Sequence, residues 1–141
     1  MKIWAISDKN KRSEKNLKWF NKKYNMHELS IVTNIIEIAE REVKKAHAQS
    51  VSKIELDIGV LSGVEMQAFD FAWQQAIPNT SLARAERIVN RLQAITECED
   101  CKYQFEAENL YELCPKCEGI NTKMLQGKEM KVRSLELVFE D

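Results

Sequence analysis

The apolar residues of the first half of the chain follow two helical patterns with a strand pattern between them. Intervals of three and four residues predict a helix that begins near residue 28 and ends near 47–50. Its expected inward stripe consists of Leu29, Val32, Ile36, Ala39 and Val43. Residues 53–60 alternate strictly between polar and apolar, which is typical of a half-buried strand. A second helix is predicted over residues 64–76, with Pro78 just after its end.

The second half of the chain predicts two further strands with a cysteine-containing segment between them. A less regular strand is expected over residues 87–95 and another after Gly127, whereas residues 98–117 contain no good helix. We therefore expect an α+β fold, with two helices packed on a three-stranded sheet and an inserted four-cysteine zinc-ribbon domain. The expected parts are an extension (1–25), an α+β domain (26–95 plus 126–141) and the ribbon (96–125).

Charge divides the chain into a basic extension and an acidic body. Residues 1–25 carry eight Lys or Arg against two Asp or Glu, or +6, whereas residues 26–141 carry thirteen against twenty, or −7. Duplex nucleic acid requires clustered positive charge, so we do not expect the body to bind nucleic acid. We interpret the extension as a flexible tail or as residues upstream of the true start. A membrane-surface or nucleic-acid arm is the alternative.

The sequence contains no pattern typical of a membrane or secreted protein. No apolar run approaches the roughly 18–20 residues that a spanning helix needs. The apolar stretch at the start is shorter than the ~7–15 residues of a signal-peptide core. The predicted compartment is therefore a reducing cytoplasm, where cysteines seldom form structural disulfides.

Two C-x2-C pairs, Cys98 with Cys101 and Cys114 with Cys117, carry the strongest chemical signal. Two such knuckles supply four sulfur ligands at about 2.3 Å in a tetrahedral set that suits zinc. Four protein ligands leave no open position, so the predicted zinc is structural. A thiol oxidoreductase and a nucleic-acid-binding ribbon are the alternatives, although residues 97–123 carry seven acidic side chains against three lysines.

The chain has two histidines, and one of them begins a metal-binding pattern. His47 lies near the predicted helix end, where an imidazole beside the last carbonyls is ordinary. His27 is a capping or surface residue or, if the chain begins at Met26, part of a chelate made by the α-amine, the amide nitrogen and the imidazole. Three nitrogens in a plane suit Ni(II) or Cu(II), and Glu28 or a group from another segment would complete the set.

Several segments together resemble one known family. Residues 26–31, Met-His-Glu-Leu-Ser-Ile, are similar to the first residues of the HypA/HybF family of hydrogenase nickel-incorporation proteins. Residues 58–64, Ile-Gly-Val-Leu-Ser-Gly-Val, resemble the strand and turn of that family, and residues 127–132 resemble its closing strand. The two C-x2-C pairs fit its zinc ribbon. The resemblance covers residues 26–141 in order and without large gaps.

The resemblance implies a nickel metallochaperone without catalytic residues. It implies nickel ligation by Met26, His27 and Glu28, a further carboxylate at Glu65 after the strand turn, and a structural zinc ion held by the four cysteines. Ni(II) is then the cargo, and its destination is the precursor of a nickel–iron hydrogenase large subunit. The implied partners are a HypB-type GTPase, that precursor and, in some organisms, urease accessory proteins. The protein would act as a monomer or homodimer.

Two features depart from the family pattern. The family uses the free amine of its first residue for nickel, whereas here twenty-five residues precede Met26. Either the physiological chain begins at Met26, or the site lacks that ligand. The family also often has Glu at the position of Val60. The alternative function from another class is a zinc-ribbon interaction or nucleic-acid-binding module.

Overall fold

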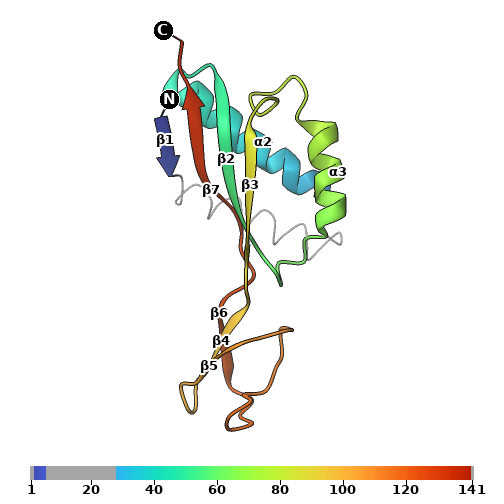
Figure 1. Ribbon diagram of the computed structural model, residues 1–141, viewed down its shortest axis with the longest axis vertical. Coiled ribbons are helices and arrows are strands. Elements are labelled where there is room, and N and C mark those ends of the chain that lie inside the picture. Colours follow the sequence, from blue (N-terminus) through green and yellow to red (C-terminus); the bar gives the residue numbers. More distant parts are fainter. Residues whose placement is uncertain (1, 6–27, 141) are drawn as a thin grey trace. The chain divides into compact units, whose positions relative to one another are not determined.

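The computed structural model describes residues 2–5 and 28–140, which form two helices and seven strands (Figure 1). In chain order these are β1 (Lys2–Ala5), α2 (Glu28–Ala46), β2 (Ser50–Gly59), α3 (Met66–Ala76), β3 (Glu86–Leu92), β4 (Ile95–Cys98), β5 (Gln104–Glu106), β6 (Thr122–Gln126) and β7 (Met130–Val138). Met26 and His27, two of the expected nickel ligands, lie outside the described residues. In the described part, neither helix has the length and apolarity to cross a membrane.

The strands form two sheets, one of four strands in the order β1-β7-β2-β3 and one of three in the order β5-β4-β6. The expected α+β class is confirmed, and the three expected strands of the first sheet are β2, β3 and β7. Strand β1 adds a fourth at the edge and pairs antiparallel with β7, so that Lys2 lies opposite Leu137 and Ala5 opposite Ser134. The sequence did not predict β1, because four residues are too few for a periodic pattern.

Helices α2 and α3 contact each other, and α2 crosses behind β2 and β3 (Figure 1). The core beneath them includes Ile54 and Leu56 of β2, which are fully buried. Helix α3 contributes Phe69, Ala72 and Trp73. Each large apolar side chain buried in this way contributes about 1.5–3 kcal/mol relative to exposure. Hydrophobic burial therefore holds the helices on the sheet.

The buried face of α2 differs in part from the predicted stripe. The buried residues are Ile31, Val32, Ile35, Ile38, Ala39, Glu42 and Val43. Leu29 is instead 54% exposed and Ile36 is half-buried, so the prediction was wrong at these two positions. The face consists of two adjacent rows at helical spacing, and one row includes the carboxylate of Glu42. That row also contains Ile31, Ile35 and Ile38, and the predicted stripe left it out.

Helix α2 ends with a local cap at His47. The N–H of His47 donates to the carbonyl of Lys44 at 3.2 Å, and the N–H of Ala48 donates to that of Val43 at 2.9 Å. His47 has a φ of 56°, the left-handed conformation that such helix ends commonly require. The residue has a structural role at the helix end, which agrees with the sequence interpretation.

The chain divides into two compact units. The first contains the described parts of residues 1–56, 64–89 and 131–141, and it includes both helices. The second consists of Asp57–Gly63 and Asn90–Met130 and includes all four cysteines. The second unit therefore takes in the end of β2 and the turn after it, in addition to the cysteine segment.

Within the second unit, backbone segments pass very close to one another at two glycines. A Cβ atom on Gly59 would lie 2.1 Å from the carbonyl oxygen of Gly127, and one on Gly127 would lie 2.7 Å from the Cα of Ala94. Gly127 also has a φ of 128°, and its N–H donates to the carboxylate of Glu129 at 2.7 Å. Only glycine fits this approach.

We expect Gly127→Ala to destabilise the second unit more than Gly63→Ala. Both glycines have positive φ, so either substitution carries a backbone cost of roughly 1 kcal/mol. At Gly63 no heavy atom lies within 4 Å of an added Cβ, whereas at Gly127 the methyl meets backbone and adds about 1–3 kcal/mol. Amide hydrogen exchange in residues 90–130 measures the difference. Equal loss of protection in the two variants would contradict this packing argument.

Candidate metal centres

The two cysteine knuckles share one backbone geometry, although their sequences differ. The N–H of Lys102 donates to the carbonyl of Cys98 at 2.9 Å, and the N–H of Glu118 donates to that of Cys114 at 2.8 Å. Lys102 and Glu118 have left-handed φ values of 65° and 60°. In both knuckles the N–H of the first cysteine also donates to the carbonyl five residues ahead. Each C-x2-C pair therefore lies on a closed turn.

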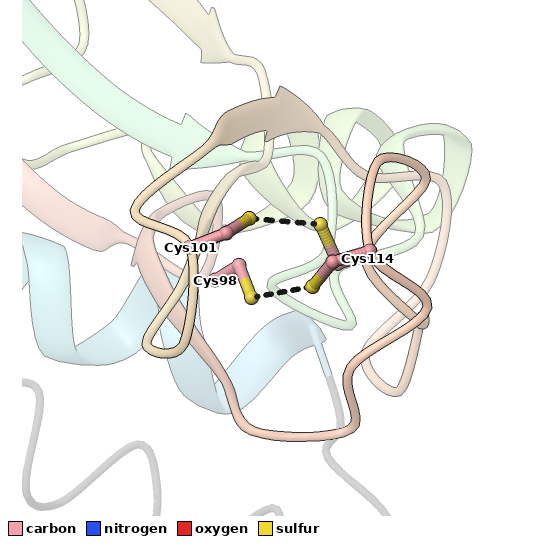
Figure 2. A group of neighbouring side chains, drawn as sticks. Cys98, Cys101 and Cys114 are labelled. Carbon is pink, nitrogen blue, oxygen red and sulfur yellow. Dashed lines mark hydrogen bonds between the residues drawn. The ribbon is translucent and has the colours of Figure 1, made fainter.

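The turns bring the four sulfur atoms together, and three of the cysteines are labelled in Figure 2. All four Sγ atoms lie within 4.8 Å of one another. The Sγ atoms of Cys98 and Cys117 are 3.5 Å apart, and those of Cys101 and Cys114 are 3.7 Å apart. In a regular tetrahedron with 2.3 Å metal–sulfur bonds, neighbouring sulfurs would be about 3.8 Å apart. The four free thiols thus fit one tetrahedral ion.

Electrostatics within the cluster favours thiolates that surround a cation. Burial opposes ionisation of Cys114, but the backbone N–H groups of Cys117 and Lys116 outweigh it and lower its pKa from 9.0 to about 7. At Cys117 the N–H of Gly119 favours the thiolate, but the sulfur of Cys98 and the other thiols outweigh it and raise the pKa to about 12. Ionisation of one thiol thus opposes ionisation of its neighbours until a cation offsets the repulsion.

Gly119 leaves space for the sulfur cluster, a role that sequence reasoning missed. A Cβ atom at this position would lie 3.2 Å from the Sγ of Cys117 and 3.5 Å from that of Cys98. It would also lie 2.9 Å from a carboxylate oxygen of Asp100. The glycine directly follows Glu118, the left-handed residue of the second knuckle. In the sequence it stands two residues after Cys117, and this spacing is the signal that could have identified it.

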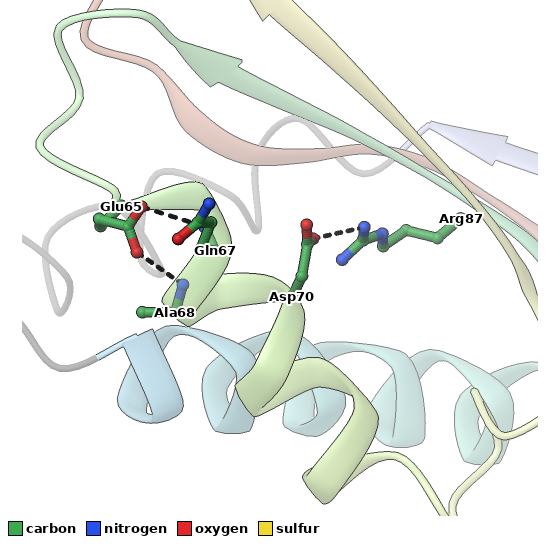
Figure 3. Close-up of polar contacts among 5 residues, drawn as sticks. All are labelled: Glu65, Gln67, Ala68, Asp70 and Arg87. Carbon is green, nitrogen blue, oxygen red and sulfur yellow. Dashed lines mark hydrogen bonds and ion pairs between the residues drawn. The ribbon is translucent and has the colours of Figure 1, made fainter.

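Glu65 lies directly before α3 and caps the helix, as Figure 3 shows. Its Oε2 accepts the N–H of Ala68 at 2.7 Å, and its Oε1 accepts the N–H of Gln67 at 3.2 Å. Each carboxylate oxygen has two acceptor positions, so these bonds leave further lone pairs. A metal ion bound by Glu65 would share this carboxylate with the start of α3.

The N-terminal ends of α2 and α3 lie side by side (Figures 1 and 3). Glu28 is the first residue of α2, and Glu65 directly precedes α3. The described structure therefore brings the two expected carboxylates to the same end of the helix pair. Met26 and His27, the other two expected nickel ligands, lie outside the described residues.

A polar contact that sequence reasoning missed connects α3 to β3. The Nη2 atom of Arg87 donates to the Oδ1 atom of Asp70 at 2.6 Å (Figure 3). The Arg87 guanidinium also lies 5.4 Å from the ring centroid of Phe69 and 5.3 Å from that of Trp73. These cation–π contacts and the ion pair orient the helix that Glu65 begins. Seventeen residues separate the paired charges, so no local pattern reveals them.

Comparison with known proteins gives consistent matches to one group. Residues 26–137 match the profile of the family described as hydrogenase/urease nickel incorporation, metallochaperone, HypA. Hydrogenase maturation factor HypA from Parabacteroides distasonis is 39% identical over 115 residues, which is 82% of this chain and all of that protein. The HypA of Aquifex aeolicus is 38% identical over 112 residues, 79% of this chain and 97% of that protein.

Solved structures give the same result. The solution structure of the Ni metallochaperone HypA from Helicobacter pylori is 30% identical, with a TM-score of 0.59, over 82% of this chain and all of that one. A second HypA solution structure is also 30% identical, with a TM-score of 0.62, over 82% of this chain and 98% of that one. The family match begins at residue 26, after the basic extension.

Removal of the helix cap at Glu65 should destabilise the first unit. Glu65→Ala loses both acceptors of the α3 cap and should lower the free energy of unfolding by about 1 kcal/mol (range roughly 0.5–2). Glu65→Gln keeps an amide oxygen that accepts the N–H of Ala68 and should lose less. Urea unfolding followed by helical circular dichroism measures both variants. Equal stability of wild type and Glu65→Ala would show that the cap contributes nothing.

Proposed function

Because the chain belongs to the HypA family of hydrogenase and urease nickel-incorporation metallochaperones, we propose that it binds Ni(II) as cargo through Met26, His27 and Glu28. It delivers the ion to the precursor of a nickel–iron hydrogenase large subunit. A HypB-type GTPase is the partner in this delivery, and urease accessory proteins are a further class of partner. We propose no catalytic residue for it, and we assign its transfer function to the cytoplasm, where cysteine thiols stay reduced.

The adjacent starts of α2 and α3 are the observation that carries the nickel proposal. Residues 26 and 27 lead directly into α2, whose first residue is Glu28. Glu65 lies at the neighbouring helix start, so a metal ion held before α2 is within the same region as a second carboxylate (Figure 3). Carboxylates at helix N-termini are also favoured by the helix dipole, and they offset its repulsion of a cation.

The nitrogen and oxygen ligands of residues 26–28 suit nickel better than the four sulfur ligands of the cysteine cluster do. Imidazole is a ligand common to Ni, Zn and Cu, and it is the only strong nitrogen side-chain donor in residues 26–28. A free amine at Met26 adds a planar nitrogen chelate. Without that amine, His27 combines with Glu28, Glu65 and water in an octahedral set. Either site has exchangeable ligands, which a cargo ion requires.

The four cysteines are proposed to hold a structural zinc ion. Their sulfur separations of 3.5 and 3.7 Å fit a tetrahedral thiolate set, and zinc is the ion that most commonly takes one. The ion would cross-link the two knuckles and leave no position open for chemistry. In this proposal the closed site of four sulfur ligands holds zinc, and the open site of nitrogen and oxygen ligands at residues 26–28 holds nickel.

One zinc ion per chain is expected in protein purified without chelator. Cys98→Ser should lose this zinc and the structure of the ribbon, because the metal supplies much of the folding free energy of so small a module. Both helices belong to the other compact unit, so most of the helical circular dichroism should remain. Metal analysis and far-ultraviolet spectra test this. Absence of zinc in the wild type, or complete loss of helix in the variant, would contradict it.

His27→Ala should abolish tight nickel binding and leave zinc content unchanged. His47→Ala is the matched control, because it removes the chain's other imidazole from the end of α2 distant in sequence from the proposed site. Calorimetric titration with Ni(II), with absorption spectra recorded alongside, measures both. Nickel affinity that survives His27→Ala, or falls equally in His47→Ala, would remove the site from residues 26–28.

A further inference from the structure

Three large apolar side chains on the segment that carries the second knuckle are more than half exposed. Tyr111 is 92% exposed, Leu113 56% and Ile120 78%. Scattered single exposed hydrophobic residues are normal on a protein surface, but a group on one short segment needs an explanation. We refer to Tyr111, Leu113 and Ile120 as the knuckle patch.

Hydrogen bonds to the backbone bring two members of the knuckle patch, Leu113 and Ile120, close together. The N–H of Cys114 donates to the carbonyl of Gly119 at 3.1 Å, and the hydroxyl of Thr122 donates to the carbonyl of Glu112 at 3.4 Å. Residues 112–114 therefore run alongside residues 119–122. This pairing places Leu113 beside Ile120, two positions that are seven residues apart in sequence.

The loop before the knuckle patch is held in place by its own carboxylate. The Oε2 atom of Glu112 accepts the N–H of Glu108 at 2.6 Å and that of Asn109 at 3.4 Å. These bonds close a loop over residues 108–112, which contains Tyr111. A surface ordered in advance loses less entropy when a partner binds, so the patch is suited to docking.

The surroundings of the knuckle patch are acidic. Residues 106–120 contain four glutamates and one lysine, a formal charge of −3 before the cysteines are counted. The lysine, Lys116, lies over the ring of Tyr103 at 5.6 Å from its centroid. Four thiolates around a divalent cation would add two further negative charges. An anionic membrane or a nucleic acid would therefore be repelled.

We propose that the knuckle patch is a docking surface for a protein partner that presents apolar side chains within a Lys- or Arg-rich surface. Apolar contact with Tyr111, Leu113 and Ile120 supplies affinity, since exposed tyrosine and aliphatic groups contribute most when a partner excludes water from them. The acidic surroundings speed association and select basic partners. This role goes beyond nickel binding and does not depend on residues 26–28.

The experiment uses the full chain in the cells that produce it, with a photo-crosslinking benzoylphenylalanine at position 120. The matched control carries it at position 71, because Phe71 is 66% exposed but lies on α3. We expect position 120 to crosslink one protein, identified by mass spectrometry, through a peptide with apolar residues flanked by Lys or Arg. Crosslinks only to a second copy of this chain, to an acidic peptide, or to no protein would overturn the proposal.

The purified partner then provides a quantitative test by calorimetry. Leu113→Ser and Ile120→Ser should each weaken its binding about tenfold or more, and added salt should weaken it further. Phe71→Ser should leave the affinity within about twofold. Zinc content and circular dichroism establish that each variant is folded. Affinity insensitive to both patch substitutions, or sedimentation with phosphatidylserine vesicles that Ile120→Ser abolishes, would overturn the proposal.

Discussion

Four cysteine sulfur atoms lie within 4.8 Å of one another, and thiolates at that separation repel unless a cation lies among them. We expect the cysteine segment of the second unit to depend on this cluster, because its strands are short. Strands β4, β5 and β6 have four, three and five residues. Two of the few buried side chains of the segment are Cys98 and Cys114 themselves. In the proposed zinc-bound form, metal ligation would replace the hydrophobic core that so small a module lacks.

The first unit is held by a different kind of interaction. Phe69, Trp73 and the buried face of α2 pack on the sheet, so burial of apolar surface stabilises the helices. Their packing brings the starts of α2 and α3 together, and with them Glu28 and Glu65. A hydrophobic core thus positions the proposed oxygen ligands, while the cysteine cluster lies in the other unit. Under the proposed function, this division would let one chain hold a structural ion and carry another.

The sequence predicted those features whose signals are local. The spacing of the cysteines predicted a cluster that the structure contains, and the alternation of residues 53–60 predicted most of β2. The stripe through Leu29 and Ile36 failed because α2 also has an apolar row through Ile31, Ile35 and Ile38, and the tertiary packing buries that row instead. The cap at Glu65 and the distant Asp70–Arg87 pair depend on backbone geometry and tertiary contact, which periodicity does not encode.

X-ray absorption at the nickel and zinc edges, on protein loaded with both ions, tests the central claim most directly. The account predicts zinc with four sulfur neighbours at about 2.3 Å. It predicts nickel with nitrogen and oxygen neighbours alone, since residues 26–28 contain no thiol and residue 65 is a carboxylate. Sulfur in the nickel shell, or nitrogen and oxygen in the zinc shell, would contradict the division of the two metals between the two parts of the chain.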